Sequence, residues 1–331
     1  MIISKRSQYL VILCFVSLGT FVYFDFSYTY LIREMVEPII PHHNIEQKDN
    51  NAIEAYGISE WMKKKEKSYF ETHKVIKEVC KKYNMSSSNN INIRPLMMDT
   101  YYKWGYCPNA KVGTSTWRDH FAKLMMTKDR PNSYSGTFEA PHKRTILGSY
   151  FRIPRQLTQQ LDESKTITSK AFANFLEQHH ILTFSFVRHP FERIVSAYKD
   201  KVLNEKRFHR GSFSEFIDEF VLTKDNIHWR PFQSRCNFCA ISYHVIGRME
   251  NFNDDVKYII LKNNLTKVLP IEATMDHKAN FSEEKNNKEK EEESLRYFSK
   301  LSKTQIQQLY EKYRIDFEML SFDAMEYLQL Q

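Results

Sequence analysis

Residues 184–201 read FSFVRHPFERIVSAYKDK, and this stretch decides the expected fold. The apolar run at residues 181–187 (ILTFSFV) predicts a strand. A helix is expected to start near Pro190, because a first helical turn tolerates proline well. Arg188 stands at the strand exit, and Ser196 follows within the helix. The forked arginine side chain suits bidentate contact with a phosphate and the serine adds a hydroxyl donor, so the pair predicts a phosphate site.

A similar alternation extends on both sides of this stretch. A short apolar and aromatic segment at residues 100–107 predicts another strand, and a helix is expected at residues 115–126. Further helical patterns cover residues 212–222, 253–262 and 303–317. Strands that alternate with helices predict an α/β domain with a mainly parallel central sheet flanked by helices.

A second candidate anion site lies at residues 106–117, which read YCPNAKVGTSTW. This pattern predicts a strand, a turn and a helix, and the N–H groups and dipole of a helix N-terminus favour an anion. Lys111 would add a mobile charge, and Gly113 would let the backbone approach the ligand. Hydroxyl donors and an N-cap are expected from Thr114, Ser115 and Thr116. The segment lacks the G-x-x-x-x-G-K-[ST] pattern of P-loop kinases. An ordinary capped turn is the alternative interpretation.

Together, the two motifs resemble those of the carbohydrate sulfotransferases, especially the group that contains the chondroitin, dermatan and HNK-1 enzymes. The resemblance covers about residues 101–322 and includes a distal segment, IHWRPFQSRCNFCAISYHVIGRME, at residues 227–250. It implies a P-loop-like sulfotransferase fold and transfer of a sulfuryl group from PAPS (3′-phosphoadenosine 5′-phosphosulfate) to a carbohydrate hydroxyl. In one departure from that family, Ala110 rather than proline directly precedes the lysine, and Pro108 lies two residues earlier.

The resemblance also implies roles for individual residues. Lys111 would contact the bridging or sulfuryl oxygens, and Arg188 and Ser196 would bind the 3′-phosphate. The 5′-phosphate would be wrapped by the turn residues Val112, Gly113, Thr114, Ser115 and Thr116. Arg248, in the distal segment, is a candidate second contact to the cofactor or acceptor, with an ordinary surface arginine as the alternative.

Sulfuryl transfer resembles phosphoryl transfer, in which positioning and charge stabilisation dominate. Lys111 is therefore the expected catalytic cation. The acceptor hydroxyl also needs a general base, for which His142 and His228 are candidates. Glu192, Arg193 and His189 are expected to serve structure. No metal motif appears, and PAPS chemistry by this route needs no metal cofactor.

The N-terminus predicts a membrane anchor. Lys5 and Arg6 precede an uncharged apolar run, which favours a cytosolic tail and a lumenal remainder. A cleaved signal peptide ending near Ser17 and Gly19 is the alternative. The expected parts are a cytosolic tail (1–8), a transmembrane signal anchor (9–24), a lumenal stem (25–92) that is helical over residues 54–82, and a catalytic domain (93–331). Asn-x-Ser/Thr sequons at Asn84, Asn264 and Asn280 agree with a lumenal glycoprotein. The predicted location is the Golgi membrane, as a single-pass type II protein.

Charge and cysteine content narrow the partners. The formal net charge of +8 favours anionic ligands such as nucleotides and acidic glycans, whereas the arginine runs and aromatic signatures of nucleic-acid binding are absent. Four cysteines permit three disulfide pairings, and a zinc site with His228 is a weaker alternative. These four are Cys80, Cys107, Cys236 and Cys239. The charge run at residues 283–293 is interpreted as a solvated loop or helix start.

The leading function is therefore carbohydrate O-sulfation, with chondroitin or dermatan GalNAc 4-O-sulfation as the first subclass. Two alternatives belong to other classes: a lumenal glycan-binding protein on the same fold that has lost catalysis, and a nucleotide kinase with an unusual P-loop. The intact Lys111, Arg188 and Ser196 argue against the first, and the absent Walker pattern argues against the second. The sequence does not distinguish among acceptor sugars, because related enzymes share the cofactor motifs.

Overall fold

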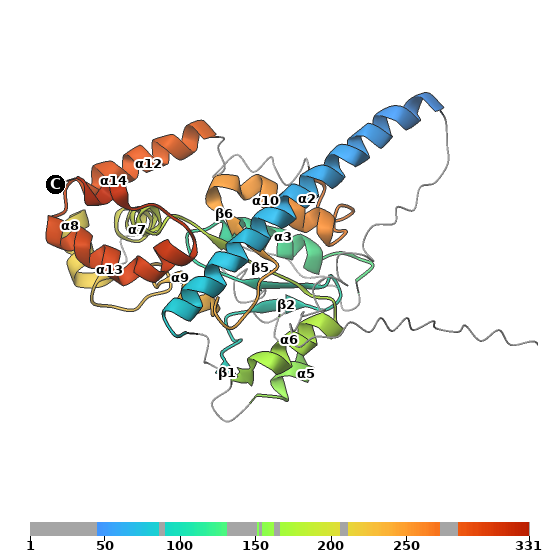
Figure 1. The fold of residues 1–331 in the computed structure, drawn as a ribbon, viewed down its shortest axis with the longest axis horizontal. Helices are drawn as coiled ribbons and strands as arrows, with labels where there is room; N and C mark the ends of the chain where they lie inside the picture. The colour runs from blue at the N-terminus through green and yellow to red at the C-terminus, as the bar shows by residue number, and fades with distance from the viewer. Residues whose placement is uncertain are drawn as a thin grey trace, which may run out of the picture. The chain divides into compact units, whose positions relative to one another are not determined.

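The computed structural model describes residues 45–85, 90–130, 151, 154–161, 166–205, 211–271 and 284–330, with side chains described from Gly57 onward except at residues 155–156 and 284–287. By its internal contacts the chain divides into two compact units, residues 1–56 and 57–331. The fold below is that of the second unit (Figure 1).

A four-stranded sheet forms the centre of this unit, in the order β2-β3-β5-β6. The strands are β2 (Met97–Asp99), β3 (Trp104–Cys107), β5 (Leu182–Val187) and β6 (Val245–Arg248). The β3–β5 and β5–β6 pairs are parallel, and β2 is antiparallel to β3. All six residues of β5 are buried, as expected of a central strand covered on both faces. The predicted α/β domain with a mainly parallel sheet is confirmed for the described chain.

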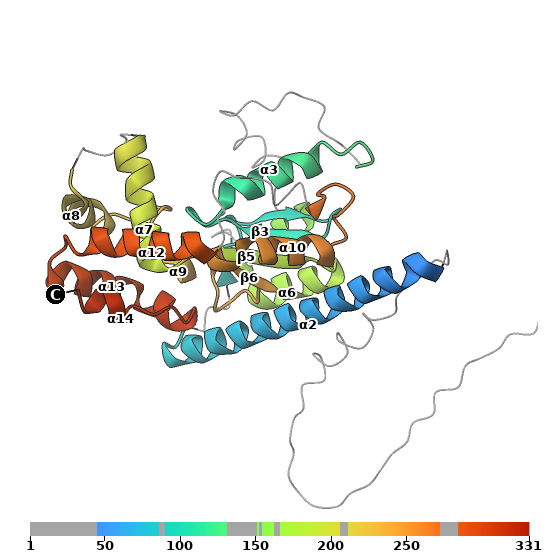
Figure 2. The ribbon, with the colours of Figure 1, turned by 90° about the horizontal axis from the view of Figure 1, so that it is seen from above.

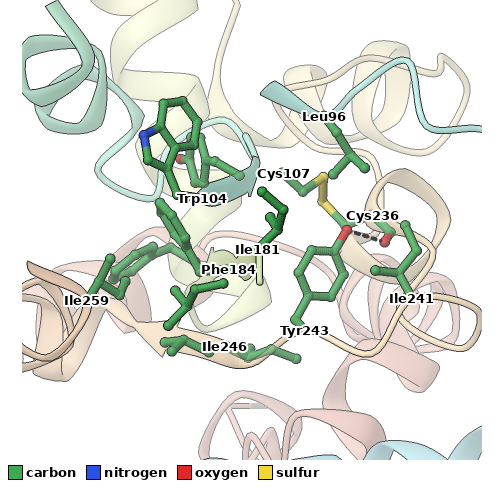
Figure 3. Packing of buried hydrophobic residues seen from close by; sticks show 14 of the residues in the cluster. Leu96, Trp104, Cys107, Ile181, Phe184, Cys236, Ile241, Tyr243, Ile246 and Ile259 are labelled. Atoms are coloured by element: carbon green, nitrogen blue, oxygen red, sulfur yellow. Dashed lines mark hydrogen bonds between the residues drawn. A yellow bond between two sulfur atoms is a disulfide. The ribbon is translucent and has the colours of Figure 1, made fainter. Parts of the chain in front are cut away.

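Helices cover both faces of the sheet, and α2 (Ile45–Lys82) and α3 (Thr114–Met125) lie on opposite sides of it (Figure 2). On the α3 side, the ring centroid of Trp117 lies 4.5 Å from that of Phe184. Phe252, the first residue of α10 (Phe252–Lys262), contacts Phe186 on the same face. Alternate residues of β5, Phe184 and Phe186, therefore supply aromatic rings to the core on this side. Figure 3 shows Phe184 among the buried residues around it.

A second hydrophobic cluster lies beside the sheet and consists mainly of helices. Its helices are α7 (Pro190–Tyr198) with its π-helical continuation η1 (Lys199–Asn204), α8 (Phe213–Phe216) with η2 (Ile217–Val221), α12 (Glu284–Phe298), α13 (Lys303–Met319) and α14 (Met325–Leu328). At its centre, the Phe191 ring of α7 lies 4.5 Å from Phe298 and 4.9 Å from Phe317. The buried face of α7 thus belongs to this cluster, and its other face, with Glu192 and Ser196, lines a cleft.

Shorter elements complete the described fold. They are β1 (Asn90–Ile91) paired antiparallel with β4 (Ile167–Thr168), α5 (Arg155–Thr158), α6 (Ser169–Gln178), α9 (Phe232–Cys236) and the 3-10 turn η3 (Met249–Asn251).

Most predicted elements are present, with differences at their ends. The strand expected at residues 100–107 is wrong in its first half, because residues 100–103 form a turn that closes with Lys103 in a left-handed conformation (φ 55°). Of the two interpretations of the charge run at residues 283–293, a solvated loop or a helix start, the helix start is confirmed, because α12 begins at Glu284. The C-terminal helical pattern is confirmed as α13, which extends to Met319.

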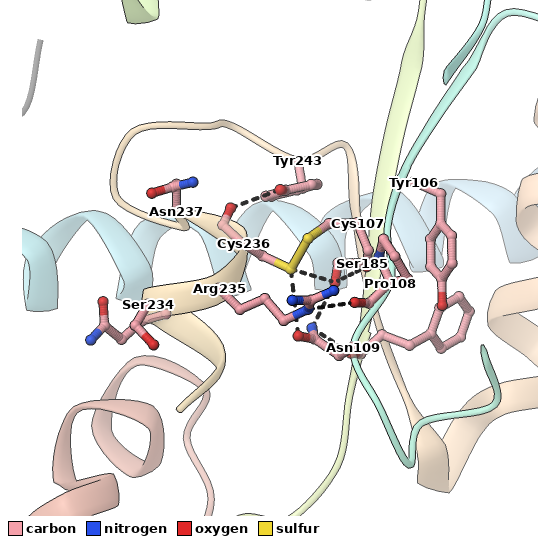
Figure 4. The surroundings of a disulfide bond; sticks show 12 residues. Tyr106, Cys107, Pro108, Asn109, Ser185, Ser234, Arg235, Cys236, Asn237 and Tyr243 are labelled. Atoms are coloured by element: carbon pink, nitrogen blue, oxygen red, sulfur yellow. Dashed lines mark hydrogen bonds between the residues drawn. A yellow bond between two sulfur atoms is a disulfide. The ribbon is translucent and has the colours of Figure 1, made fainter. Parts of the chain in front are cut away.

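Two disulfide bonds join distant parts of the chain. Cys80 pairs with Cys239, and Cys107 pairs with Cys236. This pairing engages both cysteines of the Cys-x-x-Cys motif, so neither is left as a zinc ligand. The Cys107–Cys236 bond lies beside β5 and the turn that follows β3 (Figure 4). Within the described ranges no three His, Cys, Asp or Glu side chains gather as a metal site requires. The expectation of a metal-independent protein stays a prediction.

The predicted anchor at residues 9–24 lies outside the described residues, as does the sequon at Asn280. None of the helices in the described part of the chain is both long and apolar enough to span a membrane. The boundary between stem and catalytic domain at residue 93 stays a prediction. The helix expected before it is confirmed as α2, whose Tyr69 and Ile76 are buried in the same core as the sheet.

Candidate active site

A cleft of about 1410 Å³ brings the two predicted phosphate motifs together. One wall is the turn after β3, which contributes Lys111 and Gly113, followed by the first residues of α3. The other wall is the exposed side of α7, with Ser196, and Arg188 just before the helix. Residues around His228 and part of α12 also line the cleft. The two motifs are distant in sequence but adjacent here, because β3 and β5 are parallel neighbours whose carboxyl ends meet at one sheet edge.

The turn after β3 has a backbone that depends on glycine. Both Lys111 (φ 70°) and Gly113 (φ 74°) adopt left-handed conformations. A Cβ atom at Gly113 would lie 2.3 Å from Cε2 of Phe252, so only glycine fits this position. The backbone of the turn can therefore approach a ligand closely.

The N-terminus of α3 differs from expectation in its cap. The N-cap residue is Gly113, and no side chain caps the helix, so the predicted hydroxyl cap is wrong. Thr114 instead donates its hydroxyl to the carbonyl oxygen of Asn109. Because the first turn of α3 has no side-chain cap, its N–H groups remain suited to an anionic ligand.

Buried polar contacts hold the turn in place. Asn109 is fully buried, and its Nδ2 donates to Ser185 Oγ at 3.1 Å and to the Phe186 carbonyl at 3.3 Å. Val112 is also fully buried, so its side chain belongs to the core and only its backbone remains for a ligand. The sequence therefore anchors the turn on both sides of Lys111.

Arg193 connects the turn to the opposite wall of the cleft. It is 1% exposed, and burial lowers its pKa to about 10, so it stays charged at neutral pH. Its guanidinium donates to the carbonyl oxygens of Ala110 (3.0 Å), Ile227 (3.1 Å) and Arg230 (2.7 Å). These contacts agree with the structural role predicted for Arg193.

The exposed face of α7 carries a stripe of polar side chains. Arg188 Nε donates to Oε2 of Glu192 at 2.9 Å, one helical turn away. Glu192, Ser196 and Asp200 then follow at four-residue intervals, and all of them line the cleft. Glu192 was expected to serve structure only. It lines the cleft and contacts the arginine that is predicted to bind phosphate.

Two charged pairs meet at Asp200, one helical turn beyond Ser196. Lys111 Nζ lies 2.9 Å from Asp200 Oδ2, and Lys201 Nζ lies 3.1 Å from the same oxygen. Burial acts to raise the pKa of Asp200, but the hydrogen bonds from both lysines outweigh it, and the pKa is lowered. Asp200 is therefore an ionised carboxylate in a cleft that also carries several cations.

His228 is the base candidate that the structure describes. It lines the cleft, and its buried Nδ1 has no hydrogen-bond partner among the described residues. Burial lowers its pKa to about 4, helped by the charges of Lys201 and Lys111. The imidazole is therefore neutral at neutral pH and able to accept a proton. His142 lies outside the described residues, and His189 is buried with its Nε2 2.8 Å from the Asp323 carbonyl, as a structural residue would be.

Comparison with known proteins accords with this geometry. The family model described as "Sulfotransferase family" matches residues 94–323, which include every cleft element named above. The chain belongs to the sulfotransferase family. Membership implies PAPS as the sulfate donor. No solved structure matches the chain.

Individual relatives of this sulfotransferase are distant but align over most of their length. Carbohydrate sulfotransferase 11 of Danio rerio is 25% identical over 293 residues, which is 77% of this chain and 76% of the relative. Carbohydrate sulfotransferase 10 of Gallus gallus is 24% identical over 298 residues, 78% of this chain and 76% of the relative. Carbohydrate sulfotransferase 10 of Homo sapiens is 23% identical over 306 residues.

One predicted contact lies apart from the others in this sulfotransferase. Arg248 is not among the residues that line the cleft. Its guanidinium lies 4.5 Å from the centroid of the Phe322 ring and donates to the carbonyl oxygen of Leu320. These contacts hold the Arg248 side chain in the fold, and the predicted contact with the cofactor or acceptor stays a prediction.

Other cleft residues of the sulfotransferase were not predicted. Asp200 and Lys201 end the stretch that decides the fold, and the four-residue spacing from Glu192 and Ser196 was a signal that could have found Asp200. Lys290 and Glu293 of α12 also line the cleft, and Glu293 accepts from Lys199 at 2.5 Å. The charge run around them has no apolar periodicity that would mark one face of the helix as facing a site.

Proposed function

We propose that this sulfotransferase transfers the sulfuryl group of PAPS to a carbohydrate hydroxyl in the Golgi lumen, with GalNAc 4-O-sulfation of chondroitin or dermatan as the first acceptor class. The observation that carries the proposal is the meeting of Lys111, the uncapped α3 N-terminus, Arg188 and Ser196 in one cleft. Single-pass anchoring through residues 9–24 and a stem up to residue 92 complete the proposed organisation.

The donor, which supplies the sulfuryl group, fits these residues by charge and hydrogen bonding. The backbone N–H groups of Thr114, Ser115 and Thr116 and the hydroxyls of Ser115 and Thr116 would hold the 5′-phosphate, as a P-loop-like turn does, while the Thr114 hydroxyl stays bound to Asn109. Arg188, held by Glu192, would bind the 3′-phosphate together with Ser196. Gly113 supports this arrangement, since a side chain there has no room beside Phe252.

Two side chains would carry the chemistry. Lys111 would stabilise negative charge that develops on the transferred group or the bridging oxygen. His228, neutral because of its lowered pKa, would accept the proton of the acceptor hydroxyl. Arg193 would keep the two aligned, because it binds the backbone next to each of them, at Ala110 and Ile227.

A carbohydrate acceptor is supported by the names of the relatives and by the charge of the cleft. Arg94, Arg118 and Arg235 line it in addition to the residues assigned to the donor. These side chains would favour a glycan that carries carboxylate or sulfate groups.

The test is transfer of label from sulfur-35 PAPS by the secreted chain from Asp25 onward. A panel of chondroitin, dermatan, desulfated heparan and N-glycan acceptors would identify the substrate class. We expect label on one acceptor. Lys111→Ala should lower the rate of transfer about 10²-fold to 10³-fold or more. Transfer by Lys111→Ala at the wild-type rate would contradict the assignment, and a wild-type chain that binds no PAP (3′-phosphoadenosine 5′-phosphate) would contradict both phosphate motifs.

A further inference from the structure

Asp200 has no role in the mechanism above, yet it contacts the proposed catalytic cation directly. Its Oδ2 lies 2.9 Å from Nζ of Lys111, and both residues line the cleft. The two side chains are 31% and 20% exposed. An ion pair at this level of exposure contributes little to the stability of the fold. Its main effect is to fix the position of the Lys111 ammonium group.

The backbone around Lys111 is fixed, but the backbone alone does not place the ammonium. The carbonyl of Ala110 is bound by Arg193, and Val112 is buried in the core. Between these two anchors, Lys111 leaves the chain from a left-handed conformation (φ 70°). A lysine side chain has four flexible carbons beyond that point, so a further contact is needed to order its charge.

The backbone of Asp200 is held by the π-helical geometry that follows α7. The backbone N–H of Glu205 donates to the Asp200 carbonyl at 2.9 Å, a five-residue step that is wider than an α-helical turn. Such single-turn π segments are often found at functional sites. Lys201 also contacts the Asp200 carboxylate and is itself held by Glu205, with 2.5 Å between Nζ and Oε1.

From this geometry we infer that Asp200 is a positioning residue, which orients the Lys111 ammonium toward the sulfuryl group of the donor. A lysine ammonium has three N–H donors. One of them is directed at Asp200 Oδ2, which leaves two for oxygens of an anionic ligand. The inference deepens the proposed function and rests on it, since Lys111 acts on the donor only if the donor binds in this cleft.

The role predicts opposite effects on binding and on turnover. Removing the carboxylate takes a negative charge away from an anion-binding cleft, so binding of the anionic donor should strengthen. The same change releases the Lys111 ammonium, so transfer should slow. Damage to the fold would weaken both together, and this difference separates positioning from a merely structural role.

The experiment compares Asp200→Ala and Asp200→Asn with the wild-type chain. PAP affinity is measured by calorimetry, turnover by transfer of label to the glycan accepted by wild type, and folding by thermal unfolding. Glu219→Gln is the control, because Glu219 is an exposed residue of η2 that does not line the cleft. Acetylation of Lys111 by an N-hydroxysuccinimidyl ester, followed by mass spectrometry, reports directly whether the ammonium is held.

We expect Asp200→Ala to bind PAP about threefold to tenfold more tightly and to lower kcat about 10-fold to 100-fold. The amide oxygen of Asp200→Asn still accepts a hydrogen bond, so its kcat should lie between those of Asp200→Ala and wild type. Lys111 should be acetylated faster in Asp200→Ala. An unchanged kcat in Asp200→Ala, or PAP binding that weakens in step with kcat, would overturn the inference while leaving the proposed function intact. Failure of wild type to bind PAP would overturn the proposed function and the inference with it.

Discussion

Arg193 Nε donates to the carbonyl oxygen of Ala110 at 3.0 Å, and this bond connects a buried helix residue to the turn that carries Lys111. The same guanidinium binds the carbonyls of Ile227 and Arg230, on either side of His228 and Trp229. One buried cation therefore fixes both segments from which the proposed catalytic side chains leave the backbone.

Replacing Arg193 should damage the fold and the site together. Arg193→Met would leave three carbonyl groups without their donor, and we expect a loss of about 3 to 5 kcal/mol in the free energy of unfolding. Arg193→Lys keeps the charge but lacks the planar fork, so it should recover only part of this loss. Urea unfolding measures the effect. A fully stable Arg193→Met variant would show that the three contacts are dispensable.

Arg188 should act on one phosphate group only. Its proposed partner is the 3′-phosphate, so Arg188→Ala should weaken binding of PAP about 10-fold to 100-fold and change binding of AMP, which lacks that group, very little. Calorimetry with both nucleotides checks this expectation. Lys111→Ala is the comparison, because it should leave the preference for PAP over AMP unchanged. An equal loss for both nucleotides in Arg188→Ala would assign Arg188 to another part of the donor.

Gly113 should tolerate no side chain. Gly113→Ala would place a Cβ atom 2.3 Å from the Phe252 ring in a left-handed backbone, and we expect a cost of about 2 kcal/mol or more. Gly57 supplies a matched control within α2, since a Cβ there meets no atom within 4 Å. Gly57→Ala should be neutral or stabilise by about 0.5 to 1 kcal/mol. Thermal unfolding of the two variants should therefore give shifts of different sign or size; equal shifts would contradict this account of the turn.

The pH dependence of transfer should report His228. Its pKa is lowered to about 4 by burial, and by Lys201 and Lys111, so the free enzyme should lose kcat/KM only as the pH falls toward that value. A bound anionic donor counteracts the two lysines, so the acid limb of kcat should lie at higher pH than that of kcat/KM. His228→Asn should lower kcat about 10²-fold to 10⁴-fold and abolish this limb. If the limb persists in His228→Asn, another group is the base.

Stability must be followed in the same experiment. The folded-state pKa of His228 lies below its usual value, so the unfolded chain binds a proton first as the pH falls. Its contribution to stability is therefore present above about pH 6.5 and is lost as the pH falls toward about 4. Unfolding measured across the same range separates this loss from the loss of catalysis.

The parts of the fold predicted from sequence are those in which a local pattern decides the structure. The largely apolar run before Arg188, rich in β-branched and aromatic residues, predicted a strand, and Pro190 marked the helix start. The left-handed turn at Lys103 had no such signal, because a lysine gives no indication of positive φ. The false expectation of a threonine cap at α3 arose in the same way, since Gly113 serves as the N-cap and Thr114 instead bonds Asn109.

The residues of the candidate site that stand in sequence motifs could be predicted. The residues that reach the site only through tertiary contacts could not. Lys111 and Arg188 stand in recognisable segments, but the bond between Lys111 and Asp200 joins residues 89 positions apart. The place of Glu293 in the cleft likewise depends on how α12 packs against α7. A charge run without apolar periodicity contains no information about such a neighbour.

Aromatic ring contacts join Tyr327 of α14 to residues at the start of α7, next to the cleft. Tyr327 lies 5.1 Å from Phe191 and stacks on His189 at the same distance, and its neighbours in sequence do not line the cleft. A premature stop codon just before Tyr327 would therefore remove no proposed ligand contact, yet it would withdraw the support of the helix that presents Arg188. A substitution that removes the Tyr327 ring should therefore be assayed for donor binding as well as for stability.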